Sequence, residues 1–76
     1  MIRYEPFWET LKQSPESTYT LIKKHGISSS TIDKLRNNKP LTTTTINDLC
    51  HILHCDVDGI MHYVSSDEDQ FLEPMP

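Results

Sequence analysis

Two cysteines and two histidines are the side chains of this chain that are best suited to binding a metal. They lie in the segment Cys50-His51-Ile52-Leu53-His54-Cys55. On a helix each cysteine would share a face with one histidine, because residues four apart are neighbours. Zinc needs a closed tetrahedral set of ligands, and no second cluster of the Cys-x2-Cys type accompanies this segment. We therefore expect no bound metal and interpret Cys50 as a small buried hydrophobe.

Side chains with catalytic potential show no recognisable arrangement. The spacing specifies neither a Ser/His/acid set nor a Cys/His pair. The acidic run at residues 67–69 lacks a context that would form a pocket around it. We therefore expect neither an enzyme nor a cofactor.

The length of 76 residues allows one small domain with one core. No apolar run approaches the roughly 18 residues of a membrane span, and the first five residues lack the apolar stretch of a secretory signal. Cys50 and Cys55 are five positions apart in a predicted helix, so their side chains should diverge and a disulfide is not expected. These observations predict a cytoplasmic protein in a reducing compartment.

Positive charge is concentrated in the middle of the chain, although the formal net charge is −4. Residues 12–39 carry six basic side chains and two acidic ones. Residues 65–76 carry four acidic side chains and no basic one. The net negative charge of the whole chain combines a basic middle region with an acidic end. It therefore does not argue against a nucleic-acid partner for the middle of the chain.

Short helices separated by helix breakers are the elements that must position these side chains. Apolar residues recur at helical spacing within residues 6–13, 18–25, 29–36 and 46–53. A short fifth helix is expected to begin at residue 56 or 57. No segment shows the alternation that is typical of a strand. The predicted fold is therefore all-α with five helices.

Two of these helices are joined by a very short turn, which is the most informative feature of the sequence. Ser17 is a good N-cap for the second helix, and Gly26 should end it because glycine adopts positive φ freely. Ile27 would fill the corner between the helices, and Ser28 should cap the third helix. The apolar residues of the third helix then pack inward. Its other face is left free to enter a DNA major groove.

This pattern resembles the Cro/cI-type helix-turn-helix family, which is also called lambda-repressor-like or XRE. In particular it resembles the family's small single-domain bacterial regulators. The resemblance covers residues 6–64 and is carried by the segments 17–32, 46–50 and 60–64. It implies a compact five-helix bundle with the helix-turn-helix at helices 2 and 3. It also implies a sequence-specific transcriptional regulator of repressor type.

The implied organisation is a helix-turn-helix DNA-binding domain at residues 1–64 and an acidic tail at residues 65–76. In the family the third helix, here residues 29–36, reads double-stranded DNA. Base edges would be contacted by four of its residues: Ser29, Ser30, Asp33 and Lys34. Phosphates would be contacted from the start of the second helix and from the segment after the third, by Ser17, Thr18, Arg36, Asn37, Asn38, Lys39, Thr43 and Thr44. Free N–H groups and hydroxyls suit such positioning contacts.

The sequence also departs from the family pattern. The family often has long Gln or Arg side chains where Ser29 and Ser30 stand, and two serines reach only nearby base edges. The family often has a small residue such as Ala where Ile22 stands, so the second and third helices are expected to pack slightly further apart.

Partners other than DNA remain alternatives. The resemblance favours a homodimer, for which Ile52 and the Met61–Val64 end are candidate faces. A second hypothesis keeps the same scaffold as a protein-interaction module, antitoxin-like or regulatory, that uses the third helix or the acidic tail. Phe71 and Leu72 with their acidic neighbours would then dock on a partner or on the basic face of this domain.

Overall fold

The computed structural model describes residues 1–67 and residue 69 of the chain. The α-helices of this described part are α1 Glu5–Gln13, α2 Thr18–Lys23, α3 Ser29–Arg36 and α4 Thr43–Leu53. The remaining elements are a 3-10 turn, η1 Val57–Gly59, and two strands, β1 Ile2–Arg3 and β2 His62–Tyr63. None of these described helices is long and apolar enough to cross a bilayer.

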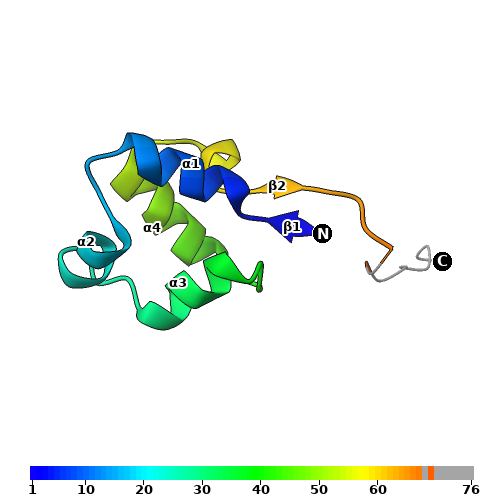
Figure 1. The fold of residues 1–76 in the computed structure, drawn as a ribbon, viewed down its shortest axis with the longest axis horizontal. Helices are drawn as coiled ribbons and strands as arrows, with labels where there is room; N and C mark the ends of the chain where they lie inside the picture. The colour runs from blue at the N-terminus through cyan, green and yellow to red at the C-terminus, as the bar shows by residue number, and fades with distance from the viewer. Residues whose placement is uncertain (68, 70–76) are drawn as a thin grey trace.

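The core lies where the four helices meet. In Figure 1, α1 lies at the top, α2 at the left and α3 at the bottom, while α4 runs between them. The largest side chains with less than 2 % exposure are Phe7, Leu21, Leu35, Leu49 and Ile60. Each of the four helices and the turn after α4 contributes one of them. Burial of these apolar groups therefore holds all the elements together.

The α2–turn–α3 segment has the local structure that its sequence predicts. Ser17 Oγ accepts a hydrogen bond from the N–H of Thr20 at 3.2 Å, and the N–H of Ser17 donates to Thr20 Oγ1 at 2.8 Å. Gly26 has a φ of +73°. Ser28 Oγ accepts from the backbone N–H three residues later at 3.1 Å, and Ile27 is buried at the corner. The expected caps and the glycine turn are therefore confirmed.

The expected fifth helix is confirmed only in part, because a 3-10 helix, η1, begins at Val57 but ends at Gly59, and the chain then continues into β2. The hydroxyl of Thr10 in α1 donates to the carbonyl of Gly59 at 2.7 Å. The N–H of Phe7 donates to the carbonyl of Ile60 at 3.1 Å. These carbonyls point toward α1, whereas a continued helix would direct them along its own axis. The tertiary contact with α1 therefore ends the turn.

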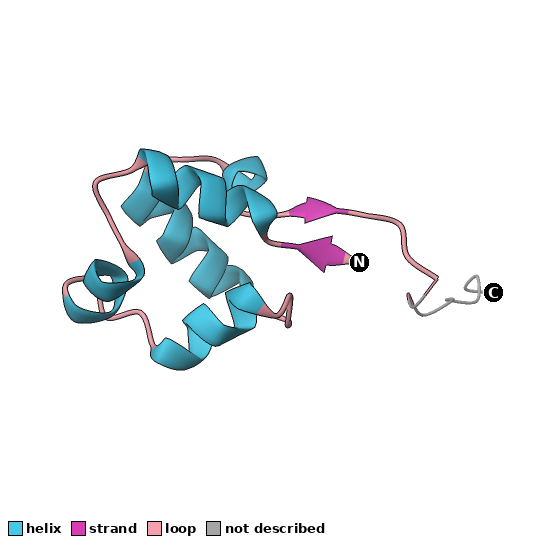
Figure 2. Cartoon of the chain, viewed as in Figure 1, coloured by secondary structure: helices cyan, strands magenta, loops and turns pink. Residues whose placement is uncertain are grey.

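The two ends of the domain form a small antiparallel sheet, which contradicts the expectation that the chain has no strand. Ile2 lies opposite Tyr63, and Arg3 lies opposite His62. Figure 2 shows this pair projecting from the helices. Strands of two residues are too short to show the alternation by which a strand is identified in a sequence. The pairing joins segments that are far apart in the chain.

The end of α4 brings the two cysteines together, and the expectation that their side chains diverge is wrong, because the two thiols lie close enough to interact. α4 ends at Leu53, and His54 adopts the left-handed conformation with φ 54° and ψ 48°. The chain then turns back, so that the N–H of Cys55 donates to the carbonyl of Cys50 at 3.1 Å. Helical spacing does not apply because the helix ends between the two residues. Both thiols are free.

The beginning of the acidic tail contacts the strand pair. Asp69 Oδ2 lies 2.6 Å from the amino group of Met1, and it accepts a hydrogen bond of 2.9 Å from the hydroxyl of Tyr63. These two contacts lower the pKa of the Asp69 carboxyl. Residue 68 and residues 70–76, including the proposed docking residues Phe71 and Leu72, lie outside the described residues.

Candidate nucleic-acid interface

The outer face of α3 carries the four side chains that the resemblance assigns to base reading. Ile32 and Leu35 are buried on the inner face of this helix, at 2 % and 1 % exposure. The residues on the outer face are all exposed: Ser29, Ser30, Asp33 and Lys34. They follow an i, i+1, i+4, i+5 pattern, which keeps them on one side of a helix with 3.6 residues per turn.

Arg36, at the end of α3, is held by two neighbours. Its Nη1 lies 3.3 Å from Asp33 Oδ1. Its Cζ lies 5.8 Å from the centre of the Trp8 ring in α1. The Arg36 side chain is still 55 % exposed, so its guanidinium remains accessible from solvent while one side faces an aromatic ring.

The loop after α3 is tied down by hydrogen bonds to the rest of the protein. Asn37 Nδ2 donates to the carbonyl of Asp33 at 2.9 Å, and Asn38 Oδ1 accepts from the N–H of Tyr4 at 2.9 Å. The hydroxyl of Tyr4 donates to the carbonyl of Lys39 at 2.8 Å. Two of the expected phosphate contacts, Asn37 and Asn38, therefore also have structural hydrogen bonds. The side chain of Lys39 is exposed beside them.

The other expected phosphate contacts lie at two helix starts. Ser17 uses its hydroxyl as the N-cap of α2, and Thr18 is half-buried in the first turn. Thr43 and Thr44 are exposed in the first turn of α4. The N-cap of α4 is Thr42, whose hydroxyl accepts from the N–H of Thr45 at 3.2 Å, so Thr43 and Thr44 are not needed as caps.

The cations of the middle segment differ in their acidic neighbours. Lys24 Nζ lies 3.8 Å from a carboxylate oxygen of Glu16, and Lys12 Nζ lies 3.9 Å from Glu9. Lys34 and Lys39 have no carboxylate within 4.0 Å among residues 1–67 and 69. Their charge is therefore not offset by a local ion pair, which favours interaction with a polyanion.

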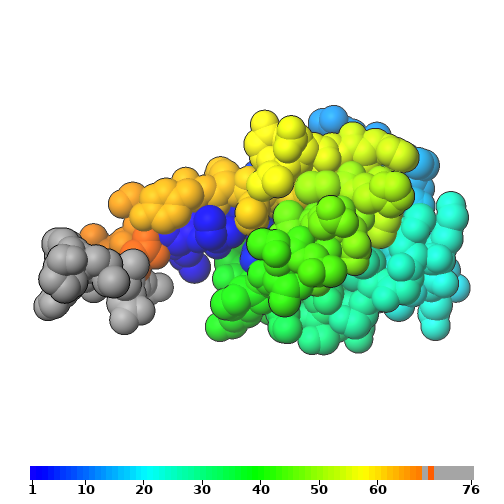
Figure 3. Space-filling model, turned by 180° about the vertical axis from the view of Figure 1, so that it is seen from behind, coloured from blue at the N-terminus to red at the C-terminus, as the bar shows by residue number. Residues whose placement is uncertain are grey.

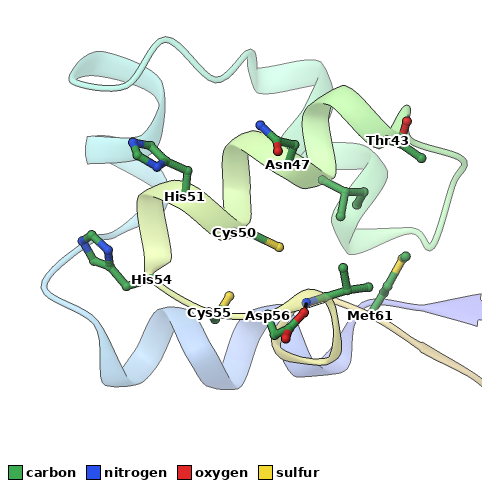
Figure 4. Close-up of a pocket in the computed structure, with 10 residues that line it drawn as sticks. Thr43, Asn47, Cys50, His51, His54, Cys55, Asp56 and Met61 are labelled. Atoms are coloured by element: carbon green, nitrogen blue, oxygen red, sulfur yellow. Dashed lines mark hydrogen bonds between the residues drawn. The ribbon is translucent and has the colours of Figure 1, made fainter.

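A separate groove lies beside the cysteines and histidines (Figure 4). It encloses about 630 Å³ and is lined by α4 and the segment after it, including Cys50, His51, His54 and Cys55. Burial raises the pKa of the Cys55 thiol, and the nearby Cys50 raises it further. Within the described part of the chain, no three metal-ligating side chains come together in an arrangement that could hold an ion. Among the described residues, the groove therefore does not form a metal centre.

Two positioning contacts could not be read from the sequence. Tyr4 contacts the loop after α3, and Trp8 contacts Arg36, the last residue of α3. Tyr4 lies 35 positions from Lys39, and no local spacing rule links residues so far apart. The sequence signals the Trp8–Arg36 contact only by the presence of an arginine and an aromatic residue in one small domain, which does not say which two residues meet.

Comparisons with known proteins identify the family. The sequence model described as the Cro/C1-type HTH DNA-binding domain matches residues 7–66. Comparisons with curated proteins and with solved structures give no significant match. The family match covers most of the 76 residues and spans α2, α3, α4 and α1 from its third residue onward. The chain therefore belongs to the Cro/C1-type helix-turn-helix family of DNA-binding domains.

Proposed function

We propose that this DNA-binding protein is a sequence-specific transcriptional regulator of repressor type that reads the major groove with α3. The observation that carries the proposal is the division of α3 into two faces, with Ile32 and Leu35 in the core and a polar face toward solvent. Such a helix enters the major groove with its outer side chains toward the base edges. We infer no catalytic role, and a cytoplasmic location follows for a bacterial regulator.

The side chains of the outer face suit particular base edges. Lys34 is the long donor, and an ammonium group can bind the O6 and N7 acceptors of guanine. Asp33 can accept a hydrogen bond from the N4 amino group of cytosine. The short side chains of Ser29 and Ser30 reach only base edges close to α3, where a hydroxyl can bond to several bases. We therefore expect Lys34 and Asp33 to determine most of the base preference.

Phosphate contacts would surround this face and fix the register of the helix. Arg36 and Lys39 supply charge at the end of α3, and Thr43 and Thr44 supply hydroxyls at the start of α4. Ser17 and Thr18 lie at the start of α2, where hydroxyls can give positioning contacts that carry no sequence information.

A homodimer would let two copies of α3 read two half-sites about 34 Å apart. Of the two candidate faces, the structure favours the strand end: Tyr63 is 65 % exposed and Val64 is 40 % exposed. Ile52 is partly buried against the core instead. The strand pair projects from the body (Figure 3), and exposed strand edges readily pair with another chain. A second copy that pairs along β2 is the arrangement we propose.

The test measures binding to the DNA that flanks the protein's own gene, by fluorescence anisotropy at two salt concentrations. Lys34→Ala should weaken specific binding by about 1–3 kcal/mol, and Arg36→Ala should lower the salt slope by about one. Lys12→Ala is the matched control, because it removes one positive charge from α1, outside the residues proposed to contact DNA. Absence of binding at low salt, or equal effects of all three variants, would overturn the proposal.

A further inference from the structure

Arg36 and Trp8 join α3 to α1 at the edge of the proposed interface. Arg36 is the last residue of α3, and Trp8 lies in the middle of α1. The centre of the guanidinium lies over the indole at 5.8 Å from the ring centroid. A cation over a ring is attracted to the π-system without needing a hydrogen bond to it, so the N–H groups of the guanidinium stay available as donors.

The indole is itself fixed in position. Trp8 packs edge-to-face on Phe7, with ring centres 4.8 Å apart and an angle of 83° between the planes. Phe7 is completely buried, and its N–H donates to the carbonyl of Ile60. A half-buried ring that is anchored to the core in this way offers a rigid surface for a flexible side chain.

The second neighbour of Arg36 acts in a different way. Asp33 approaches the edge of the guanidinium, at Nη1, and the edge is also the part that donates to phosphate oxygens. A phosphate would therefore compete with Asp33 but not with Trp8. The contact with the ring can persist in a complex with DNA, whereas the exposed ion pair with Asp33 has to exchange.

We propose that Trp8 is a positioning residue for DNA binding: it holds the Arg36 guanidinium on the edge of α3, ready to donate to a backbone phosphate. The inference rests on the proposed function, since it requires that Arg36 contacts DNA. A guanidinium held in this way loses less side-chain freedom on binding than a free one. Trp8 contributes to affinity through Arg36, without a DNA contact of its own.

The test is a double-mutant cycle on a duplex of arbitrary sequence at low salt, where phosphate contacts dominate binding. Trp8→Leu, which keeps an apolar side chain but removes the ring, should weaken binding about 3- to 10-fold in the wild-type background. In the Arg36→Ala background, Trp8→Leu should change affinity less than about 1.5-fold. Trp8→Phe keeps an aromatic ring and should restore binding to within about 2-fold of wild type.

Two further results separate the possible failures. If Arg36→Ala weakens binding but Trp8→Leu binds as wild type, or weakens binding equally in both backgrounds, the positioning role is wrong and the proposed function stands. If the protein binds no duplex at low salt, both the positioning role of Trp8 and the proposed function are wrong. Arg36→Lys keeps the positive charge and leaves Trp8 unchanged. This variant therefore tests the inference even if Trp8→Leu does not fold. It should lose most of the affinity that Arg36→Ala loses, and wild-type binding by Arg36→Lys would overturn the inference.

Discussion

The hydroxyl of Tyr4 donates a hydrogen bond of 2.8 Å to the backbone carbonyl of Lys39, which joins the start of the domain to the loop after α3. The N–H of Tyr4 donates to Asn38 Oδ1 at 2.9 Å in the same loop. Asn38 has a φ of +54°, which is uncommon for a residue with a side chain. The loop that carries Lys39 toward the proposed interface is therefore held in an unusual conformation by Tyr4, a buried residue at the start of α1.

Tyr4→Phe should destabilise the fold by about 1 kcal/mol, because it removes the hydrogen bond to Lys39 and keeps the buried ring. Urea denaturation measures this loss as a lower midpoint with an unchanged slope. Tyr19→Phe is the matched control, since the Tyr19 side chain is 69 % exposed and should give no change. Equal midpoints for Tyr4→Phe and the wild type would show that the hydrogen bond contributes nothing.

Stability should fall at alkaline pH, and part of the fall should come from Tyr4. Burial raises the pKa of Tyr4 above its ordinary value of 10.0. Above that value the unfolded chain loses the phenolic proton while the folded chain keeps it. The stabilisation is therefore complete below about pH 10 and is lost as the pH rises through the folded pKa.

The measurement compares urea midpoints at about pH 8 and about pH 11. The decline should be smaller in Tyr4→Phe than in the wild type. The pKa of Tyr63 is also raised, by its hydrogen bond to Asp69, so Tyr63→Phe serves as a second arm. A decline of the same size in Tyr4→Phe and in the wild type would contradict the role of burial.

The two glycines should respond differently to substitution by alanine. Gly26 has a φ of +73° with no heavy atom near an added Cβ, so Gly26→Ala should cost about 1 kcal/mol of conformational strain. Gly26→Asn should cost less, because asparagine tolerates the left-handed region. At Gly59 an added Cβ would lie 2.9 Å from the Cβ of Cys55. Gly59→Ala should therefore cost about 1–3 kcal/mol through overpacking.

Thermal unfolding separates these cases. Gly26→Asn should melt close to the wild type, Gly26→Ala lower, and Gly59→Ala at or below Gly26→Ala. If Gly26→Ala and Gly26→Asn melt at the same temperature as the wild type, the left-handed turn between α2 and α3 is not required for stability.

Ser28→Ala should lower stability by about 1 kcal/mol, because it removes the N-cap of α3. Ser30→Ala is the control, since its side chain is exposed in the same turn and the hydroxyl that caps α3 belongs to Ser28. Ser28→Asp should keep the cap and the stability. Its added negative charge beside the proposed interface should nevertheless weaken DNA binding. If Ser28→Asp is stable and binds DNA as tightly as the wild type, DNA does not bind beside the start of α3.

The sequence by itself determined the features that depend on neighbours a few residues apart. Ser17 and Ser28 cap helices through N–H groups three residues later, and Gly26 supplies a positive φ that its own backbone allows. The apolar spacing of Ile32 and Leu35 set the buried face of α3, and so its outer face. These short-range rules predicted the two helices and the turn by which the family is recognised.

Only the tertiary structure decided the features that depend on distant partners. Thr10 and Phe7 of α1 bind the carbonyls of Gly59 and Ile60, and the expected fifth helix is shortened to η1, which a strand follows. The positions of Arg36 and of the following loop are set in the same way by the aromatic residues of the N-terminal segment. Such contacts join residues that no local pattern relates, and they form only when the core brings their elements together.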